Sequence, residues 1–289
     1  MSRVVLARGE ARAEIALLGA EAHAWSIAGR ELLWPGDPAI WPEISPILYP
    51  VVGWTHDGRE RVEGKVYELK LHGFARFETY AVEEQTADFV RFVLRDNERT
   101  RAVYPFAFVF AVEYRLTEQA LAVTLEAANP GDRPAPYACG LHPGFRWPLG
   151  DKGREGALIR FEKSERPEVP AIVPGGLIGK GMKAVPLHGR DLPLSDPLFA
   201  HDALCFLNCA SRELAFLDAS GASVSMEFPG YRHAALWTRP GAPYVCLECW
   251  TGYSDPEGFE GDLFEKPSMR LLAAGETVRH EARFVYKAA

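Results

Sequence analysis

Two adjacent runs of alternating apolar residues constrain the fold of this chain more than any other feature. In the first run every second residue is large and apolar: Phe106, Phe108, Phe110, Val112, Tyr114 and Leu116. After a short polar turn at positions 117–119 the alternation resumes: Leu121, Val123, Leu125 and Ala127. A period of two puts these side chains on one face of a β-strand, and strands joined by so short a turn pair antiparallel. The two runs therefore predict a sheet with one buried face.

Short, closely spaced strands are predicted along the rest of the chain. Hairpin strands are expected within positions 4–33, and later candidates are 89–94, 158–161, 204–208, 214–218, 224–228, 234–238, 244–250, 269–272 and 278–286. No amphipathic helix is evident. Residues 163–197 are rich in proline and glycine, but strands flank them, which indicates a long surface excursion rather than a linker. We expect an all-β chain in which residues 1–289 form a single domain.

The segment 35–54 interrupts this pattern. It contains five prolines, and its aromatic residues include Trp41, Tyr49 and Trp54, so it cannot be regular structure for long. An aromatic, proline-stiffened loop of this kind suits the lining of a sugar site. It suits the cover over one end of a sandwich equally well.

The overall charge narrows the class of partner. The formal net charge is −7, which argues against a nucleic acid or an anionic membrane and favours a small neutral ligand. No apolar segment approaches the ~20 residues that span a bilayer, and no charged start followed by an apolar run is visible. We therefore expect a soluble, cytoplasmic protein, either a monomer or a homodimer.

The five cysteines are expected to be free thiols. Their number is odd in a chain with no visible secretion signal, which disfavours a disulfide framework: Cys139, Cys205, Cys209, Cys246 and Cys249. The spacing of the last four would also suit a zinc site with four thiolates. However, Cys246 and Cys249 lie on a predicted strand, where residues three apart face opposite ways. We therefore expect no metal site from the cysteines.

One strand carries a carboxylate among apolar neighbours. Residues 244–250 read Tyr-Val-Cys-Leu-Glu-Cys-Trp, which is too short and too rich in β-branched and aromatic residues for a helix. Alternation sends the odd-numbered residues to the core and puts Cys246, Glu248 and Trp250 on the opposite face. An unpaired buried charge is too costly to keep. Glu248 is therefore either a hydrogen-bonded structural group or a working group in a ligand cleft.

Two histidines lie in distinctive segments upstream. His72 stands in Leu-Lys-Leu-His-Gly-Phe-Ala-Arg, and His142 in Cys-Gly-Leu-His-Pro-Gly-Phe-Arg. The proline after His142 favours an extended backbone there, and Gly140 and Gly144 leave room for a close approach, with a ligand as one candidate. Taken singly, each histidine fits a structural role. Together with Glu248 they suffice for general acid–base chemistry with neither a metal nor a nucleophile.

Three ordered segments resemble the signature motifs of the aldose 1-epimerase (galactose mutarotase) family, in its LacX-like branch. They are His-Gly-Phe-Ala-Arg from His72 to Arg76, Gly-Leu-His-Pro around His142, and Cys-Leu-Glu around Glu248, followed by Trp250. Segments 31–34, 45–50 and 198–204 are also similar to that branch, in the same order. The resemblance covers nearly the whole chain. It implies a large antiparallel β-sandwich of the galactose mutarotase type, a supersandwich, with the sugar in a cleft on one concave face.

The resemblance also implies a reaction, the interconversion of the α and β anomers of an aldose. Glu248 takes the proton of the anomeric hydroxyl while His142 donates one to the ring oxygen; the open chain rotates and closes as the other anomer. The implied substrate-binding residues are His72, Arg76, Asp202 and Trp250. The acid role requires the pKa of His142 to exceed its unperturbed value of about 6.5, which nearby carboxylates would favour. No cofactor and no metal ion are implied.

The sequence departs from the family pattern at two places. Cys249 stands where the family usually has proline, and Glu43 precedes the Ser-Pro-Ile-Leu segment where many relatives have an arginine nearby. The missing arginine bears on how the sugar hydroxyls are bound. The three proton-transfer motifs are intact.

Two alternative functions stay open at this point. The chain fits a non-catalytic sugar-binding or sugar-sensing protein that keeps the cleft. It also fits a mutarotase of a phosphorylated hexose, with the phosphate neutralised by basic residues of the long excursion: Lys180, Lys183 and Arg190. His201, next to Asp202, is a further and weaker candidate for the sugar site.

Overall fold

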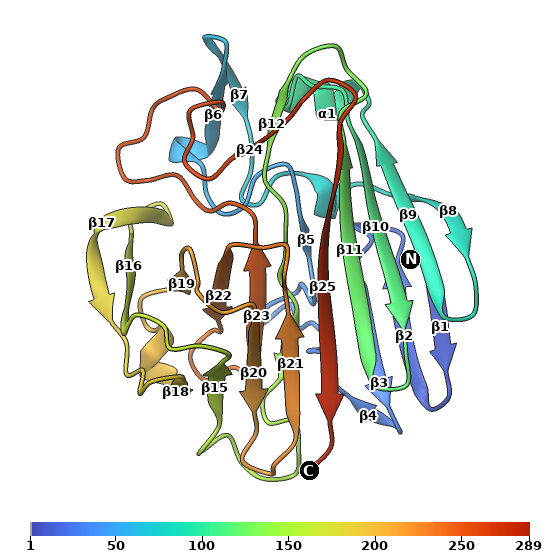
Figure 1. Cartoon of the computed structure of the whole chain (residues 1–289), viewed down its shortest axis with the longest axis vertical. Coiled ribbons are helices and arrows are strands. Elements are labelled where there is room, and N and C mark those ends of the chain that lie inside the picture. The colour runs from blue at the N-terminus through green and yellow to red at the C-terminus, as the bar shows by residue number, and fades with distance from the viewer. Residues whose placement is uncertain (1) are drawn as a thin grey trace.

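The largest sheet has nine antiparallel strands, which are labelled in Figure 1. The computed structural model describes residues 2–289 of the chain. In spatial order the strands are β18 (Asp191–Pro193), β15 (Leu158–Phe161), β20 (Glu213–Leu217), β21 (Ser223–Glu227), β25 (Thr277–Lys287), β11 (Ala120–Ala128), β10 (Val109–Leu116), β9 (Phe89–Arg95) and β8 (Ala81–Gln85). The C-terminal strand β25 thus lies in the middle of the sheet.

A second sheet carries most of the segments that the sequence motifs mark. Its order is β19 (Leu204–Phe206), β22 (His233–Trp237), β23 (Tyr244–Trp250), β13 (Gly140–Leu141) and β5 (Ile47–Leu48), and β14 (Gly144–Arg146) also pairs with β23. The N-terminal hairpins form a third sheet of β1 (Arg3–Arg8), β2 (Ala11–Ala16), β3 (Ala22–Ile27) and β4 (Arg30–Glu31).

Three two-stranded units and a few short helical turns complete the fold. The units are β6 (Arg59–Val62) with β7 (Lys65–Glu68), β12 (Ala135–Tyr137) with β24 (Arg270–Leu272), and β16 (Glu168–Val173) with β17 (Leu177–Ala184). The 3₁₀ turns are η1 (His56–Gly58), η2 (Ala75–Phe77) and η3 (Asp196–Phe199). Among the described residues, no helix is both long and apolar enough to cross a membrane.

The first two sheets pack face to face around one apolar core. Phe284 of β25 lies 5.5 Å from Phe145 of β14, measured between ring centroids. Tyr49, directly after β5, stacks on Phe110 of β10 at 4.1 Å. Burial of aromatic faces from both layers is the main source of stability in such a sandwich. The prediction of a large antiparallel β-sandwich is therefore confirmed.

The two alternating runs form β10 and β11, as predicted, with a difference at one boundary. The strands pair from Val109 opposite Ala128 to Leu116 opposite Leu121, so the short turn joins adjacent antiparallel neighbours. The first strand begins at Val109 rather than at Phe106. Phe106 and Phe108 are nevertheless buried, because the irregular chain before β10 also packs into the core.

One short helix was not predicted from the sequence. Helix α1 (Glu98–Val103) has Asn97 as its N-cap, and Asn97 and Thr100 form a reciprocal capping box. The asparagine three residues before the threonine was the available signal. Six residues are fewer than two helical turns, so no apolar periodicity can develop.

The proline- and glycine-rich excursion is more regular than its composition indicates. Residues 174–176 form the turn of the β16–β17 hairpin, which projects from the side of the molecule in Figure 1. Gly179 and Gly181, which look like loop residues in the sequence, lie within β17. The hairpin is anchored at Ile178, whose amide donates to the carbonyl of Asp255 at 2.9 Å.

Candidate active site

Strand β23 presents alternate residues to two different environments, as its sequence predicts. Val245, Leu247 and Cys249 belong to the main apolar core. Glu248 and Trp250 face the other way and line a cleft, and Glu248 is only 1% exposed. The alternation thus places one carboxylate on the floor of that cleft.

The register of the sheet brings His142 opposite Glu248. Gly140 pairs with Trp250, Leu141 with Cys249 and Gly144 with Cys246, so the two residues between β13 and β14 continue the same register. The amides of Leu247 and Thr251 donate across to Pro143 and Cys139, at 3.2 and 2.9 Å. His142 and Glu248 therefore occupy the alternate, non-hydrogen-bonded positions, where opposed side chains come closest.

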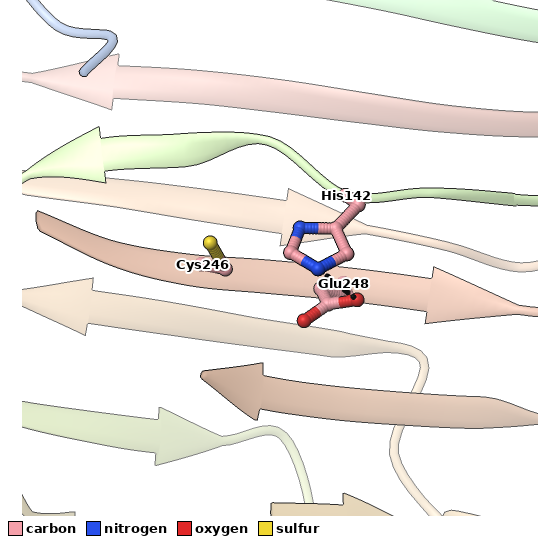
Figure 2. Close-up of side chains that lie close together, drawn as sticks. All are labelled: His142, Cys246 and Glu248. Atoms are coloured by element: carbon pink, nitrogen blue, oxygen red, sulfur yellow. Dashed lines mark ion pairs between the residues drawn. The ribbon is translucent and has the colours of Figure 1, made fainter. Parts of the chain in front are cut away.

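The side chains of His142 and Glu248 are in direct contact. The Nε2 atom of His142 lies 3.3 Å from Oε2 of Glu248, and the dashed line in Figure 2 marks this contact. The indole Nε1 of Trp250 donates to the same carboxylate oxygen at 3.1 Å. Burial raises the pKa of Glu248 well above its ordinary value, and the Trp250 hydrogen bond opposes that shift.

The two glycines beside His142 make room for tryptophans. A Cβ atom on Gly140 would lie 2.7 Å from the ring of Trp250, and one on Gly144 would lie 2.8 Å from the ring of Trp41. From the sequence, a ligand was one candidate for the group that approaches these two glycines closely. The structure shows that protein side chains fill the space at both positions.

His142 is largely buried among aromatic rings at the edge of the cleft. Its ring centroid lies 5.3 Å from that of Trp41, 5.8 Å from Trp237 and 5.6 Å from His72. Burial lowers the pKa of His142 to about 3. The expectation of a raised histidine pKa is therefore wrong for the free protein. Glu248 also prefers its neutral form when buried, so it does not supply the negative charge on which that expectation relied.

His72 is fixed in one tautomer by the backbone. The amide of Gly53 donates to Nδ1 of His72 at 2.9 Å, so the proton of the neutral ring must be on Nε2. Burial lowers the pKa of His72 well below its ordinary value, and the neighbouring His142 and Arg76 side chains add to the shift. His72 therefore lines the cleft as a neutral ring with an Nε2–H donor.

Arg76 reaches the cleft as half of an ion pair. It lies in the turn η2, and its Nη1 donates to both carboxylate oxygens of Glu43, at 2.7 and 2.9 Å. Its Nη2 donates to the carbonyl of Leu71 at 3.0 Å, which fixes the plane of the guanidinium. Glu43 is one of the residues that depart from the family pattern. The departure thus supplies a charged partner that holds Arg76 in place.

The cleft has the size and composition of a small-molecule site. Its volume is about 370 Å³, within the range of ~300–1,000 Å³ that such sites have. All six residues expected from the sequence line it: Glu248, His142, His72, Arg76, Asp202 and Trp250. His201 does not line it, nor do the basic residues of the excursion: Lys180, Lys183 and Arg190.

Several lining residues could not be assigned from the sequence alone. The segment 35–54 supplies Trp41, Glu43 and Trp54 to the lining of the cleft. The β16–β17 hairpin supplies a wall, where Gly176 abuts Trp54 so closely that a Cβ atom would lie 1.9 Å from the indole ring. Arg239, which follows β22, also lines the cleft and forms no ion pair with any described residue. A lone arginine after a strand gives no sequence signal.

The cysteines do not form a four-thiolate cluster among the described residues. All five are buried free thiols. Cys249 faces the main core, whereas Cys246 packs on the opposite face of β23 with Trp34 and Trp41. Cys209 instead donates to Glu165.

Fold and site together define the class of this protein. The chain belongs to the aldose 1-epimerase family, whose model matches residues 2–284. It is 29% identical over 262 residues to the plasmid form of protein LacX from Lactococcus lactis subsp. lactis, a match that covers 86% of this chain and 87% of the relative. The predicted membership in the aldose 1-epimerase family is confirmed, and the similarity to LacX agrees with the predicted branch.

Two solved structures share the fold over nearly their whole length. A galactose mutarotase-like protein from Lactobacillus casei superimposes with a TM-score of 0.93 at 24% identity, covering 99% of this chain and 100% of the other. A galactose mutarotase related enzyme from Lactobacillus acidophilus gives a TM-score of 0.90 at 27% identity, with coverage of 99% and 98%. The sandwich is thus the fold of galactose mutarotase-like proteins.

Proposed function

We propose that the protein is an aldose 1-epimerase, which interconverts the α and β anomers of a sugar by opening and closing its ring. The observation that carries the proposal is the contact between His142 and Glu248 on the floor of the cleft. A base and an acid side by side are what ring opening requires, because one proton leaves the anomeric hydroxyl as another reaches the ring oxygen.

Glu248 is the base and His142 is the acid in this reaction. The carboxylate takes the proton of the anomeric hydroxyl while the imidazolium gives the Nε2 proton to the ring oxygen. Rotation about the bond between the first two sugar carbons and reclosure then give the other anomer. The neutral His72 presents an Nε2–H donor, and Arg76 presents the guanidinium N–H groups that Glu43 and Leu71 leave free.

The contact between the two groups explains how the enzyme returns to its starting state. Burial opposes charge on both side chains, so before sugar binds the pair holds one titratable proton; this proton resides on Glu248, and His142 is neutral. Oε2 and Nε2 lie 3.3 Å apart, so a small movement of either side chain would bring them to hydrogen-bonding distance and let that proton pass between them. The reactive charged pair is thus a tautomer of the resting pair, with the same total number of protons.

The charges of the cleft favour a neutral aldose. Arg76 is already neutralised by Glu43, and Asp202 adds a further carboxylate to the lining. Arg239 is the remaining lining cation without an ion pair among the described residues. A phosphorylated hexose would bring about two negative charges at neutral pH to this set, whereas sugar hydroxyls can use the same donors and acceptors without a net charge.

Anomer-exchange NMR across a panel of free and phosphorylated aldoses tests the proposal. We expect faster exchange between the α and β signals of at least one unmodified aldose, and weaker acceleration for its phosphorylated form. A non-catalytic sugar-binding protein would broaden or shift the sugar signals without accelerating exchange. That outcome across the panel would replace the enzyme by a binding or sensing protein.

A further inference from the structure

Three potential metal ligands converge beside the cleft. One ligand atom each from His142, Cys246 and Glu248 lies within 4.8 Å of the other two. Figure 2 shows that Cys246 and Glu248 project from the same face of β23, while His142 reaches over them from the turn between β13 and β14. The reaction of the proposed epimerase uses His142 and Glu248 but has no role for the thiol.

The set of donors suits a borderline-soft cation. Zinc commonly takes imidazole nitrogen, thiolate sulfur and carboxylate oxygen in tetrahedral sites. With bond lengths of ~2.0–2.3 Å, donors around one such ion lie roughly 3.3–3.6 Å apart. His142 Nε2 and Glu248 Oε2 already lie 3.3 Å apart. The sulfur of Cys246 lies within 4.8 Å of the other two ligand atoms, so it needs to move toward them by at most about 1 Å, which a rotation of the cysteine side chain can supply. Magnesium and calcium, which prefer oxygen donors, do not fit this set.

The charge balance also fits a divalent ion. Cys246 and Glu248 are both buried, and among the described residues the only ion pair that involves either of them is the one between Glu248 and His142. A divalent ion bound by one thiolate, one carboxylate and a neutral imidazole makes a cluster with no net charge. Binding would release the thiol proton and the proton that His142 and Glu248 share, about two per ion. A neutral cluster is the form that costs least in a buried site.

The ion has a route to the site from the cleft. Glu248 and His142 line the cleft, whereas Cys246 lies behind them, covered by Trp41. An ion arriving through the cleft therefore meets the imidazole and the carboxylate first, and the thiol closes the site from the far side. Water in the cleft remains available for the fourth position.

We propose that His142, Cys246 and Glu248 form a binding site for a thiophilic divalent cation such as Zn²⁺, and that occupancy of this site inhibits the protein. Binding of the ion follows from the donor geometry alone. Inhibition rests on the proposed epimerase function, because the ion takes both proton-transfer groups at once. The chain would then need no metal for activity and would lose activity when this one binds.

Cadmium is the probe for the binding step, because a thiolate bound to Cd²⁺ gives an ultraviolet charge-transfer band. On titration we expect the band to saturate at one Cd²⁺ ion per chain, with release of about two protons per bound ion in a weakly buffered solution. Cys246→Ala should abolish the band. Cys249→Ala is the matched control, because it removes a thiol three residues away on the opposite face of the same strand, and it should keep the band. Absence of the band in the parent protein would overturn the proposal.

Zinc is the probe for inhibition, measured as anomer exchange at buffered free Zn²⁺. Loss of an indirect partner of a metal ligand typically costs about 10–100-fold in affinity, so loss of a direct ligand should raise the half-inhibitory Zn²⁺ concentration by at least about 100-fold. Cys246→Ala should show this shift and Cys249→Ala should not, and a chelator should restore activity in both. Unchanged inhibition of Cys246→Ala would refute the site.

Two controls keep the result interpretable. Cys246→Ser replaces the thiol by a weaker zinc ligand of similar size, and it serves if the alanine variant fails to fold. It should show the same loss of the cadmium band. If the parent protein binds Cd²⁺ but never accelerates anomer exchange, the metal site stands and the proposed function fails.

Discussion

Replacement of Glu248 by glutamine tests the central assignment most directly. Glutamine keeps the shape of the side chain and an oxygen that can accept the Trp250 hydrogen bond, which spans 3.1 Å. It cannot take a proton. A positioned general base contributes about 10²–10⁴-fold, which equals about 3–5 kcal/mol of the barrier. The turnover rate of Glu248→Gln should fall by a factor within that range, while the affinity for sugar changes little.

The structure adds a prediction about the stability of the same variant. The pKa of Glu248 is raised in the native state, so the unfolded chain releases this proton at lower pH than the folded chain does. The carboxylate therefore costs the parent protein stability as the pH rises above about 4.5, through the raised native pKa. Glutamine carries no such cost. Above that range Glu248→Gln should be at least as stable as the parent protein.

Saturation-transfer NMR between the two anomer signals and calorimetric unfolding measure both effects on the same samples. His142→Asn should lower the rate similarly, and the double variant should lose far less than the product of the two losses, because the pair acts as a unit. A folded Glu248→Gln protein with nearly full exchange activity would refute the reasoning. Glu248 would then be a buried structural acid held by Trp250.

Three further predictions follow from the ionisable groups. The exchange rate should stay near its plateau down to about pH 4.5, because the His142–Glu248 pair takes up a second proton only as the pH falls through about 3, the pKa of His142. On the alkaline side the rate should decline as the pH rises through the raised pKa of Glu248, where the pair loses its one proton. A half-maximal rate near pH 6.5 on the acid side would contradict this. Trp250→Phe removes the donor that opposes the shift of Glu248, so the alkaline limb should move to higher pH and the rate should fall about tenfold; an unmoved limb in the pH–rate profile would argue against the contact. Lys266→Met leaves two buried carboxylates, now 2.8 and 3.3 Å from its Nζ, without their cation, so denaturant unfolding at neutral pH should show a loss of about 3–5 kcal/mol, smaller near pH 5, where the carboxylates can be protonated; an equal loss at both pH values would contradict it.

The class of fold, and the strand face on which Glu248 lies, can be predicted from the sequence. Alternation is a local property of a strand, so residues 106–127 and 244–250 predict their buried faces without knowledge of their neighbours. The short turn at 117–119 forces its two strands to pair. The ordered motifs around His72, His142 and Glu248 indicated the family, because each motif is a short run of consecutive residues that can be recognised without knowledge of the fold.

The way in which those motifs meet depends on the three-dimensional packing of the chain. His142 and Glu248 are 106 positions apart, and the register between β13, β14 and β23 places them opposite each other. The ion pair between Glu43 and Arg76 likewise depends on how the 35–54 loop packs against η2. Such contacts depend on which strands and loops become neighbours, and a local pattern does not carry that information.

The direction of the pKa shifts was also decided by the tertiary structure, and there the sequence was misleading. Nearby carboxylates indicated a histidine that stays protonated. Trp41 and Trp237 enclose His142, and Glu248 is itself 1% exposed, so both groups favour their neutral forms. The sequence names the ionisable groups of a site, but burial decides which form each one takes, because the cost of a charge depends on how much water the surrounding chain excludes.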